Sequence, residues 1–133
     1  MIGPQLTVHA GLFDWFVRNP NASVPGFARA YFSGLTTLEA SNIIARIISD
    51  FPELKGIYHL SGGERIDKYS LLHLIKEQYD LPQSITIERN EDLVVDRSLD
   101  DGCFRRATGI AAKGWQTMLR EMHARSGQRT GSK

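Results

Sequence analysis

The stretch "DRSLDD", residues 96–101, gathers charged and hydroxyl side chains that could do chemistry. It lies between an apolar segment and the expected start of a helix. An arginine such as Arg97 beside a helix N-terminus can bind an anion through its guanidinium fork and the free backbone N–H groups. The alternative is an N-capped helix with a solvent-exposed salt bridge. Both interpretations stay open, as they do for Arg29, which lies near Phe27 and Tyr31 and either stacks on a base or sits at the surface.

Two glycines, Gly62 and Gly63, follow the β-branched and aromatic segment "GIYHLS" and precede a helical pattern. A glycine turn between a strand and a helix can hold a phosphate, but the phosphate and dinucleotide loops require G-x-x-x-x-G-K or G-x-G-x-x-G. The turn has neither pattern, and Glu64 would repel a phosphate held there. We therefore interpret the glycines as a tight turn between a strand and a helix.

The histidines and the cysteine do not form a recognisable metal or nucleophile site. No H-x-x-x-H or C-x-x-C spacing is present, so we expect no bound metal ion. His59 alternates with Ile57 along an expected strand, which indicates a core or rim side chain. Cys103 has Arg105 and Arg106 nearby but no evident base, so we predict no active thiol. A single cysteine also suits a reducing cytoplasm. The four histidines are His9, His59, His73 and His123.

Hydrophobic periodicity indicates the elements that must position these residues. Thr36 and Glu39 form a capping-box pattern before an isoleucine-rich helix, which we expect to be a core helix packed on more than one side and ended by Pro52. A short helix with an apolar face should end near residues 18–21. Three further helices are expected. The first covers residues 69–79, and the second begins after a cap at Asp100 or Asp101. The third carries the apolar stripe Trp115, Met118, Leu119 and Met122. Strands are expected at 56–60, 84–89 and 93–96. The stretch 23–34 should be irregular, with a short extended piece at 30–32.

The composition is that of an ordinary globular domain, with 133 residues, 41% of them apolar and 23% charged. The net charge of +1 provides no electrostatic footprint for nucleic acid or an anionic membrane. No apolar run approaches the length of about 18 residues that a membrane span needs. We expect a single, helix-rich α/β domain with a small mixed sheet at residues 1–125. A polar, disordered tail should follow at residues 126–133.

Five segments carry a resemblance to a known family: "MIGPQL", "GLFDWFVRN", "VPGFARAYFSGLTTLEASNII", "GIYHLSGGERIDKYSLLHLI" and "VVDRSLDDGCFRRATG…W". They occur in the order found in the extended short-chain dehydrogenase/reductases. The chain resembles their sugar-nucleotide reductases and epimerases, typified by dTDP-4-dehydrorhamnose reductase. The resemblance covers residues 1 to about 125 and falls within the C-terminal, substrate-binding half of that family. Its Rossmann glycine fingerprint and catalytic Tyr-x-x-x-Lys are absent here.

The resemblance implies roles for individual residues. Gly3 and Pro4 match a loop that approaches the nicotinamide and the substrate. Arg97 and Ser98 match the region whose arginine often contacts the nucleotide diphosphate. The dTDP-sugar reductases more often have a proline-containing arginine–asparagine–serine pattern there, so "DRSLD" leaves the nucleotide open. The segment that lines the sugar-nucleotide cleft contributes Phe32, Ser33, Thr36 and Thr37.

The resemblance implies the substrate-binding portion of an NAD(P)-dependent sugar-nucleotide reductase or epimerase. The chain alone should have no catalytic residue, bind no cofactor and be inactive, as expected of a separate domain, a split gene or a truncated reading frame. One alternative is a non-catalytic interaction or regulatory module, since the regulatory subunit of methionine adenosyltransferase resembles the same reductases. Another is a relic domain without a ligand. The expected partners are a nucleotide-sugar-like molecule and either a Rossmann-domain chain or a second copy of this chain.

Overall fold

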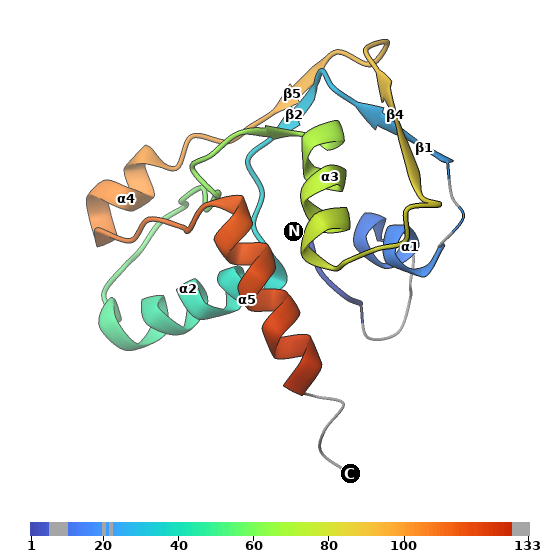
Figure 1. Cartoon of the computed structure of the whole chain (residues 1–133). Helices are drawn as coiled ribbons and strands as arrows, with labels where there is room; N and C mark the ends of the chain where they lie inside the picture. Colours follow the sequence, from blue (N-terminus) through green and yellow to red (C-terminus); the bar gives the residue numbers. More distant parts are fainter. Residues whose placement is uncertain (6–10, 20, 22, 129–133) are drawn as a thin grey trace.

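The structure is a computed structural model that describes residues 1–5, 11–19, 21 and 23–128. This part contains five helices and five short strands, and the strands form two small sheets (Figure 1). The expected helix-rich α/β fold with a small mixed sheet is confirmed. The elements are α1 (Leu12–Arg18), β1 (Ser23–Phe27), β2 (Ala30–Phe32), α2 (Thr37–Asp50), β3 (Ile66–Asp67), α3 (Lys68–Gln78), β4 (Thr86–Asn90), β5 (Val95–Arg97), α4 (Gly102–Thr108) and α5 (Trp115–Gln128).

The strands pair across long sequence distances. β1 and β4 form a two-stranded parallel sheet, and the order β3–β2–β5 forms a three-stranded sheet. In that second sheet β2 runs antiparallel to β3 and parallel to β5, so the sheet is mixed. β2 coincides with the predicted extended piece, whereas β1 falls in a stretch that we expected to be irregular. Its Pro25 and Gly26 are poor strand formers, and pairing with β4 overrides that preference.

The prediction of a strand at residues 56–60 is wrong. Residues 57–60 are not part of either sheet, and the exposed fraction of Ile57 is 96%. The local pattern is that of a strand, because exposed and half-buried side chains alternate along the segment. A strand also needs a neighbour for its backbone N–H and C=O groups, and no described strand lies beside this one.

Helix α2 begins where the capping pattern predicts. Thr36 Oγ1 accepts a hydrogen bond from the Glu39 N–H at 3.2 Å. The Glu39 carboxylate does not complete the box; it accepts from the Lys113 N–H at 3.2 Å and lies 3.6 Å from Lys113 Nζ. Glu39 therefore ties the first turn of α2 to the segment that leads into α5.

The expectation that α2 packs on more than one side is wrong. Ala40 and Ile43 are buried, whereas Ile44 is 50% and Ile48 is 73% exposed. The reason is that α5 packs against one side of α2, while Ile44 and Ile48 lie on a flank that the described chain leaves open. The C-terminal end is as predicted, because α2 stops at Asp50, just before Pro52.

The remaining helix ends follow local signals. Asp67 caps α3 by accepting from the Ser70 N–H at 2.8 Å. Gly109 ends α4 with a φ of 69°, a left-handed conformation that glycine adopts without strain. Helix α5 continues to Gln128, so it includes the start of the segment expected to be a tail, and residues 129–133 lie outside the described residues.

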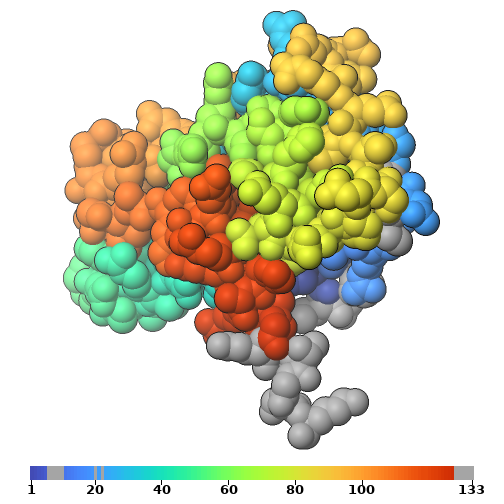
Figure 2. Space-filling model, in the orientation of Figure 1, coloured from blue at the N-terminus to red at the C-terminus, as the bar shows by residue number. Residues whose placement is uncertain are grey.

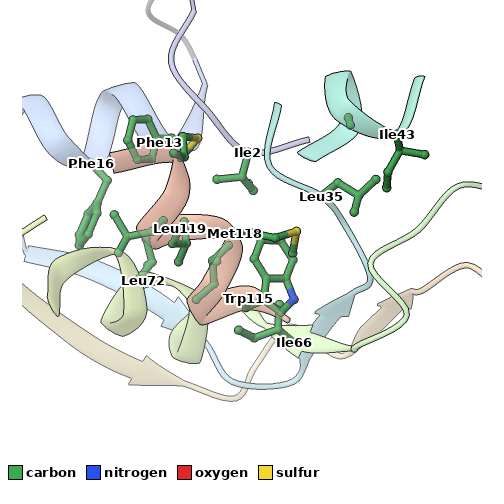
Figure 3. Packing of buried hydrophobic residues seen from close by; sticks show 14 of the residues in the cluster. Ile2, Phe13, Phe16, Leu35, Ile43, Ile66, Leu72, Trp115, Met118 and Leu119 are labelled. Atoms are coloured by element: carbon green, nitrogen blue, oxygen red, sulfur yellow. The ribbon is translucent and has the colours of Figure 1, made fainter. Parts of the chain in front are cut away.

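The core lies where α3 and α5 meet, and Figure 3 shows its side chains. The predicted stripe of α5 is confirmed, because all four of its members are buried. Figure 2 shows α5 between α2 and α3 on one face of the molecule, in agreement with the contacts of these helices. Burying one such large side chain contributes about 1.5–3 kcal/mol. The fully buried members contributed by α3 are Leu71, Leu72 and Ile75.

Candidate functional site

The parallel pairing of β2 with β5 brings two predicted site residues together. Phe32 lies in register with Arg97, so both side chains leave the sheet on the same face. The Phe32 ring packs on Trp115 with 5.5 Å between centroids. Arg97 is exposed, and its guanidinium has no ion pair or hydrogen bond among the described residues. A free guanidinium next to an aromatic ring can bind an anionic group in two-pronged fashion.

Ser33 is a buried residue that positions the segment after Arg97. Its Oγ accepts from the Leu99 N–H at 2.8 Å and lies 3.3 Å from the Leu99 carbonyl oxygen, to which it can donate. Ser61 Oγ donates to the same carbonyl at 3.1 Å. Both Leu99 backbone groups are thus held from outside the segment. The geometry gives Ser33 a supporting role, and its predicted contact with a ligand stays a prediction.

Asp96 has partners other than Arg97. Its carboxylate lies 2.7 Å from Arg65 Nη1 and accepts from the Ser98 N–H at 2.9 Å. The hydrogen bonds from Ser98, and then the contact with Arg65, hold the pKa of Asp96 below its ordinary value. Arg65 also lies over the Tyr31 ring, 4.2 Å from its centroid. The surface salt bridge that we weighed for this stretch therefore exists, but it uses Arg65 and leaves Arg97 available.

The start of α4 does not provide the anion-binding N–H groups that we considered. Asp100 Oδ1 accepts from the Gly102 N–H at 2.7 Å. The buried Asp101 pairs with Arg105 Nε at 2.8 Å. Two carboxylates already lie at this helix end, and their negative charge disfavours another anion there.

A second group of predicted residues meets at the start of α2. Ile2 forms a parallel bridge with Thr36, and the Thr37 N–H donates to the Ile2 carbonyl at 2.9 Å. A side chain on Gly3 would overlap Thr37 Oγ1, so this close approach requires glycine. Thr36 is fully buried as the helix cap. A cavity of about 600 Å³ opens beside this group, lined by Pro4, Thr37, Leu38, Ser41, Met122, Arg125 and Ser126.

The run from Phe32 to Thr37 connects the two groups. At one end it adjoins Arg97 and Ser98, and at the other end Gly3 and Pro4. The side chains that remain accessible to a ligand are those of Phe32, Thr37, Pro4, Arg97 and Ser98, whereas Ser33, Thr36 and Gly3 are buried. No described contact joins Arg97 to Pro4, so the two groups are neighbours along the chain rather than one closed pocket.

The glycines form a tight turn, as inferred, but the turn does not join a strand to a helix, because residues 57–61 are not a strand and β3 lies between the turn and α3. A side chain on Gly62 would overlap the Gly34 carbonyl oxygen, and the Gly62 N–H donates to the Ser33 carbonyl at 3.1 Å. Gly63 adopts a φ of 68°. Glu64 Oε2 accepts from the Trp115 N–H at 3.3 Å, at the start of α5. The close backbone contact and the acidic side chain do not fit a dinucleotide phosphate.

The histidines that the structure describes are dispersed. His73 packs edge-on against Tyr69 with 4.5 Å between ring centroids, and His123 packs on Tyr79 at 4.4 Å. His59 is exposed rather than in the core. His9 lies outside the described residues. Within the described chain, no three histidine, cysteine or acidic residues are grouped as a metal site would require.

Two further side chains of the sequence analysis have ordinary surface contacts. The exposed Cys103 lies 3.1 Å from Arg106 Nη2, with no base beside it. Arg29 is exposed, and its carbonyl accepts from the Val95 N–H at 3.1 Å. Lys68, rather than Arg29, lies over the Phe27 ring at 5.1 Å. None of the described helices is both long and apolar enough to cross a membrane.

Comparison with known proteins identifies the fold. No family model and no curated protein matches the chain. Among solved structures, dTDP-4-dehydrorhamnose reductase from Bacillus anthracis in complex with NADP has a TM-score of 0.69 at 12% identity, over 84% of this chain and 42% of its own. WbmH from Bordetella bronchiseptica, in complex with NAD⁺, has a TM-score of 0.67 at 14% identity, and the match covers 90% of this chain and 40% of WbmH.

A third similar structure is UDP-N-acetylglucosamine 4-epimerase from Bacillus cereus, with a TM-score of 0.64 at 13% identity over 84% of this chain and 41% of its own. This chain therefore spans about two fifths of the length of the proteins that it resembles. The resemblance expected from the sequence motifs is confirmed at the level of the fold. The chain has the fold of one part of the extended, NAD(P)-dependent sugar-nucleotide reductases and epimerases.

Proposed function

We propose that this chain is the substrate-binding portion of an NAD(P)-dependent sugar-nucleotide reductase or epimerase, without turnover of its own. The observation that supports this proposal best is the fold match, which extends over most of this chain but only about 40% of each of the similar enzymes. Because the sequence lacks a glycine fingerprint and Tyr-x-x-x-Lys, it supplies neither the pyrophosphate site nor the proton donor of such an enzyme.

The proposed ligand is the diphosphate-linked sugar. Arg97 would bind the diphosphate, because its fork is free and the Ser33–Leu99 hydrogen bonds fix the segment that follows it. Ser98 and Phe32 would lie along the same ligand. Pro4 and Thr37 would face the sugar and the nicotinamide end, beside the cavity of about 600 Å³, while Gly3 and Thr36 hold that loop in place.

A thermal-shift titration tests the proposal. We expect a rise in Tm with one of the UDP-, GDP- or dTDP-sugars and none with NAD(H) or NADP(H). A ligand at one hundred times its Kd raises stability by about 2.7 kcal/mol. Arg97→Ala should weaken binding at least tenfold, and Arg97→Lys should restore only part of it. Arg46→Ala is the control, because Arg46 is also an exposed arginine but lies on α2.

Three results would contradict the proposal. They are a Tm shift with the dinucleotides, equal ligand affinity in the Arg97→Ala variant, and robust turnover by the chain alone. No shift with any nucleotide sugar would favour the second candidate, a non-catalytic interaction module. The observation that favours this second candidate is the exposed apolar surface of Ile44, Ile48 and Ile57.

A further inference from the structure

The glycine turn at residues 61–63 contacts the segment that carries Arg97. The Ser61 side chain is buried, and its Oγ donates to the Leu99 carbonyl at 3.1 Å. The same oxygen accepts from the Gly63 N–H at 3.3 Å. That second bond uses a lone pair of the hydroxyl and leaves its hydrogen for the Leu99 carbonyl. The turn therefore directs a buried donor at the backbone just after Arg97.

The two glycines of the turn determine where Ser61 lies. The Gly62 N–H donates to the Ser33 carbonyl at 3.1 Å, and a side chain on Gly62 would overlap the Gly34 carbonyl oxygen. Gly63 has a φ of 68°, a left-handed conformation that glycine adopts without strain. Both conditions require glycine. The turn therefore fits closely against the chain between β2 and α2, and Ser61 is held there with it.

The Leu99 backbone is bonded from two sides, and packing of the Leu99 side chain does not account for this. Ser33 Oγ accepts from the Leu99 N–H at 2.8 Å, so two buried serines bind both polar groups of this backbone unit. The Leu99 side chain is 49% exposed. Residues 98–100 belong to no helix or strand. The two hydroxyl groups therefore set the path of a loop rather than the packing of its side chain.

Arg97 lies between these contacts and the sheet. On its N-terminal side β5 pairs with β2, where Arg97 is in register with Phe32. On its C-terminal side Ser33 and Ser61 hold Leu99. A residue whose backbone is already fixed loses less conformational freedom when its side chain binds a ligand. The fold therefore prepares Arg97 for an anion before the anion arrives.

We propose that Ser61, together with Ser33, is a positioning residue for Arg97, so that the glycine turn supports the anion site without forming it. Ser61 does not touch the ligand, because it is buried and its hydroxyl group is bonded as donor and as acceptor. Its effect on binding comes through Arg97. The ligand, a diphosphate-linked sugar, rests on the proposed function, whereas the fixed backbone of Arg97 does not.

The test measures the backbone order of residues 97–99 by NMR relaxation, and the Kd of inorganic pyrophosphate and of UDP-, GDP- and dTDP-glucose by NMR titration. The variant is Ser61→Ala. Its control is Thr108→Val, because Thr108 Oγ1 also donates to a carbonyl, that of Phe104 at 2.9 Å, and accepts from the Ile110 N–H at 3.1 Å, but at the other end of α4.

In Ser61→Ala we expect the order parameters of residues 98 and 99 to fall from about 0.85 toward about 0.6, and the Kd to rise at least fivefold. The control should lower the Tm by a similar amount and change neither quantity. In an Arg97→Ala background, Ser61→Ala should raise the Kd no further, because the side chain that it positions is gone. If Ser61→Ala does not fold, Ser33→Ala removes the other hydroxyl group and should loosen the same residues.

The proposal is overturned by unchanged order of residues 97–99 in the serine variants, by an equal loss of order in the control, or by an additive effect of Ser61→Ala in the Arg97→Ala background. Ligand binding with the same Kd in wild type and Ser61→Ala would reject the positioning role and keep the proposed function. Loosened residues 97–99 in Ser61→Ala, with no probe bound by the wild type, would keep the fixed backbone of Arg97 and reject the diphosphate contact of the proposed function.

Discussion

Helices α2 and α3 both carry apolar stripes, but their surroundings differ. In α3, Leu71, Leu72 and Ile75 are fully buried, because α5, β1 and β4 pack around the helix. In α2, Ile43 is buried against the core, while Ile44 and Ile48 are exposed. The apolar sequence of a helix thus predicts how much surface it can bury. Whether that surface is buried depends on which partners the chain itself provides.

This difference divides the molecule into a self-sufficient region around α3 and an open region around α2. The first region has the stability of an ordinary core, in which each lost side chain leaves a cavity. The second region contributes little to the stability of the chain alone, because its isoleucines stay in contact with water when the chain folds. Substitutions in the two regions should therefore have very different costs.

The largest effect should come from Leu72→Ala. Leu72 is completely buried between α3 and α5, so truncation leaves a cavity and should lower the free energy of unfolding by about 2–5 kcal/mol. Ile48→Ala removes a similar side chain from the exposed side of α2 and should change the free energy of unfolding by less than about 0.5 kcal/mol. Urea denaturation of both variants measures the contrast. Similar losses would show that α2 is covered in solution.

A smaller loss is expected at the turn that joins the two regions. In Gly62→Ala the added methyl group overlaps the Gly34 carbonyl oxygen, and backbone must move, at a cost of about 1–3 kcal/mol. Gly127→Ala is the control, since a methyl group there meets no atom within 4 Å. Gly127 is exposed and next to the last residue of α5, so the control should change stability by less than about 0.5 kcal/mol. Equal effects at the two glycines would reject the close contact.

Local patterns in the sequence predicted the elements whose signals are local. The α5 stripe, the Thr36 cap and the Gly109 stop all depend on residues within a few positions of each other. β1 was missed because it depends on a partner more than 50 residues away, which overrides the poor strand propensities of Pro25 and Gly26. The prediction of a strand at residues 56–60 was wrong for the opposite reason. Their pattern is that of a strand, but the described chain has no strand to pair with them.

The candidate site shows the same limit. The sequence singled out Arg97, but its availability depends on Arg65, which binds Asp96 instead. The support from Ser33 was not predictable, because it joins two residues 66 positions apart. The pairing of β2 with β5 is likewise a long-range contact. The residue types indicate the chemistry of the site. Only the fold shows which of these side chains have no partner within the described chain and can contact a ligand.

The helix caps should sharpen the comparison, because they are local and do not depend on the apolar surroundings. Asp67→Ala removes the cap of α3, and Thr36→Ala removes that of α2. Each should lower the free energy of unfolding by about 1 kcal/mol. Thermal or urea unfolding measures both losses. A negligible loss for Thr36→Ala alone would mean that the start of α2 is not formed in the isolated chain.

Tyr79, just after α3, is an exception within the closed region and should have the smallest effect. Its hydroxyl oxygen is buried and has no hydrogen-bond partner among the described residues. Burial raises the pKa of Tyr79 to about 12. The Ser126 hydroxyl lies nearby and opposes this rise, but its own hydrogen bond goes to the Met122 carbonyl at 2.9 Å. The ring itself packs against Phe13 with 5.0 Å between centroids.

The raised pKa gives a signature at alkaline pH. Between the ordinary pKa of 10.0 and about 12, the unfolded chain loses this proton while the folded protein keeps it. The contribution of Tyr79 to stability is therefore complete below pH 10 and is lost as the pH rises toward 12. Tyr79→Phe keeps the ring contacts and removes an unpaired polar group, so at pH 8 it should be neutral or slightly stabilising. Urea denaturation of both proteins from pH 8 to 12 should show the variant gaining on the wild type above pH 10. A constant difference would mean that the Tyr79 hydroxyl reaches solvent, and that the region around α3 is less closed than its side chains indicate.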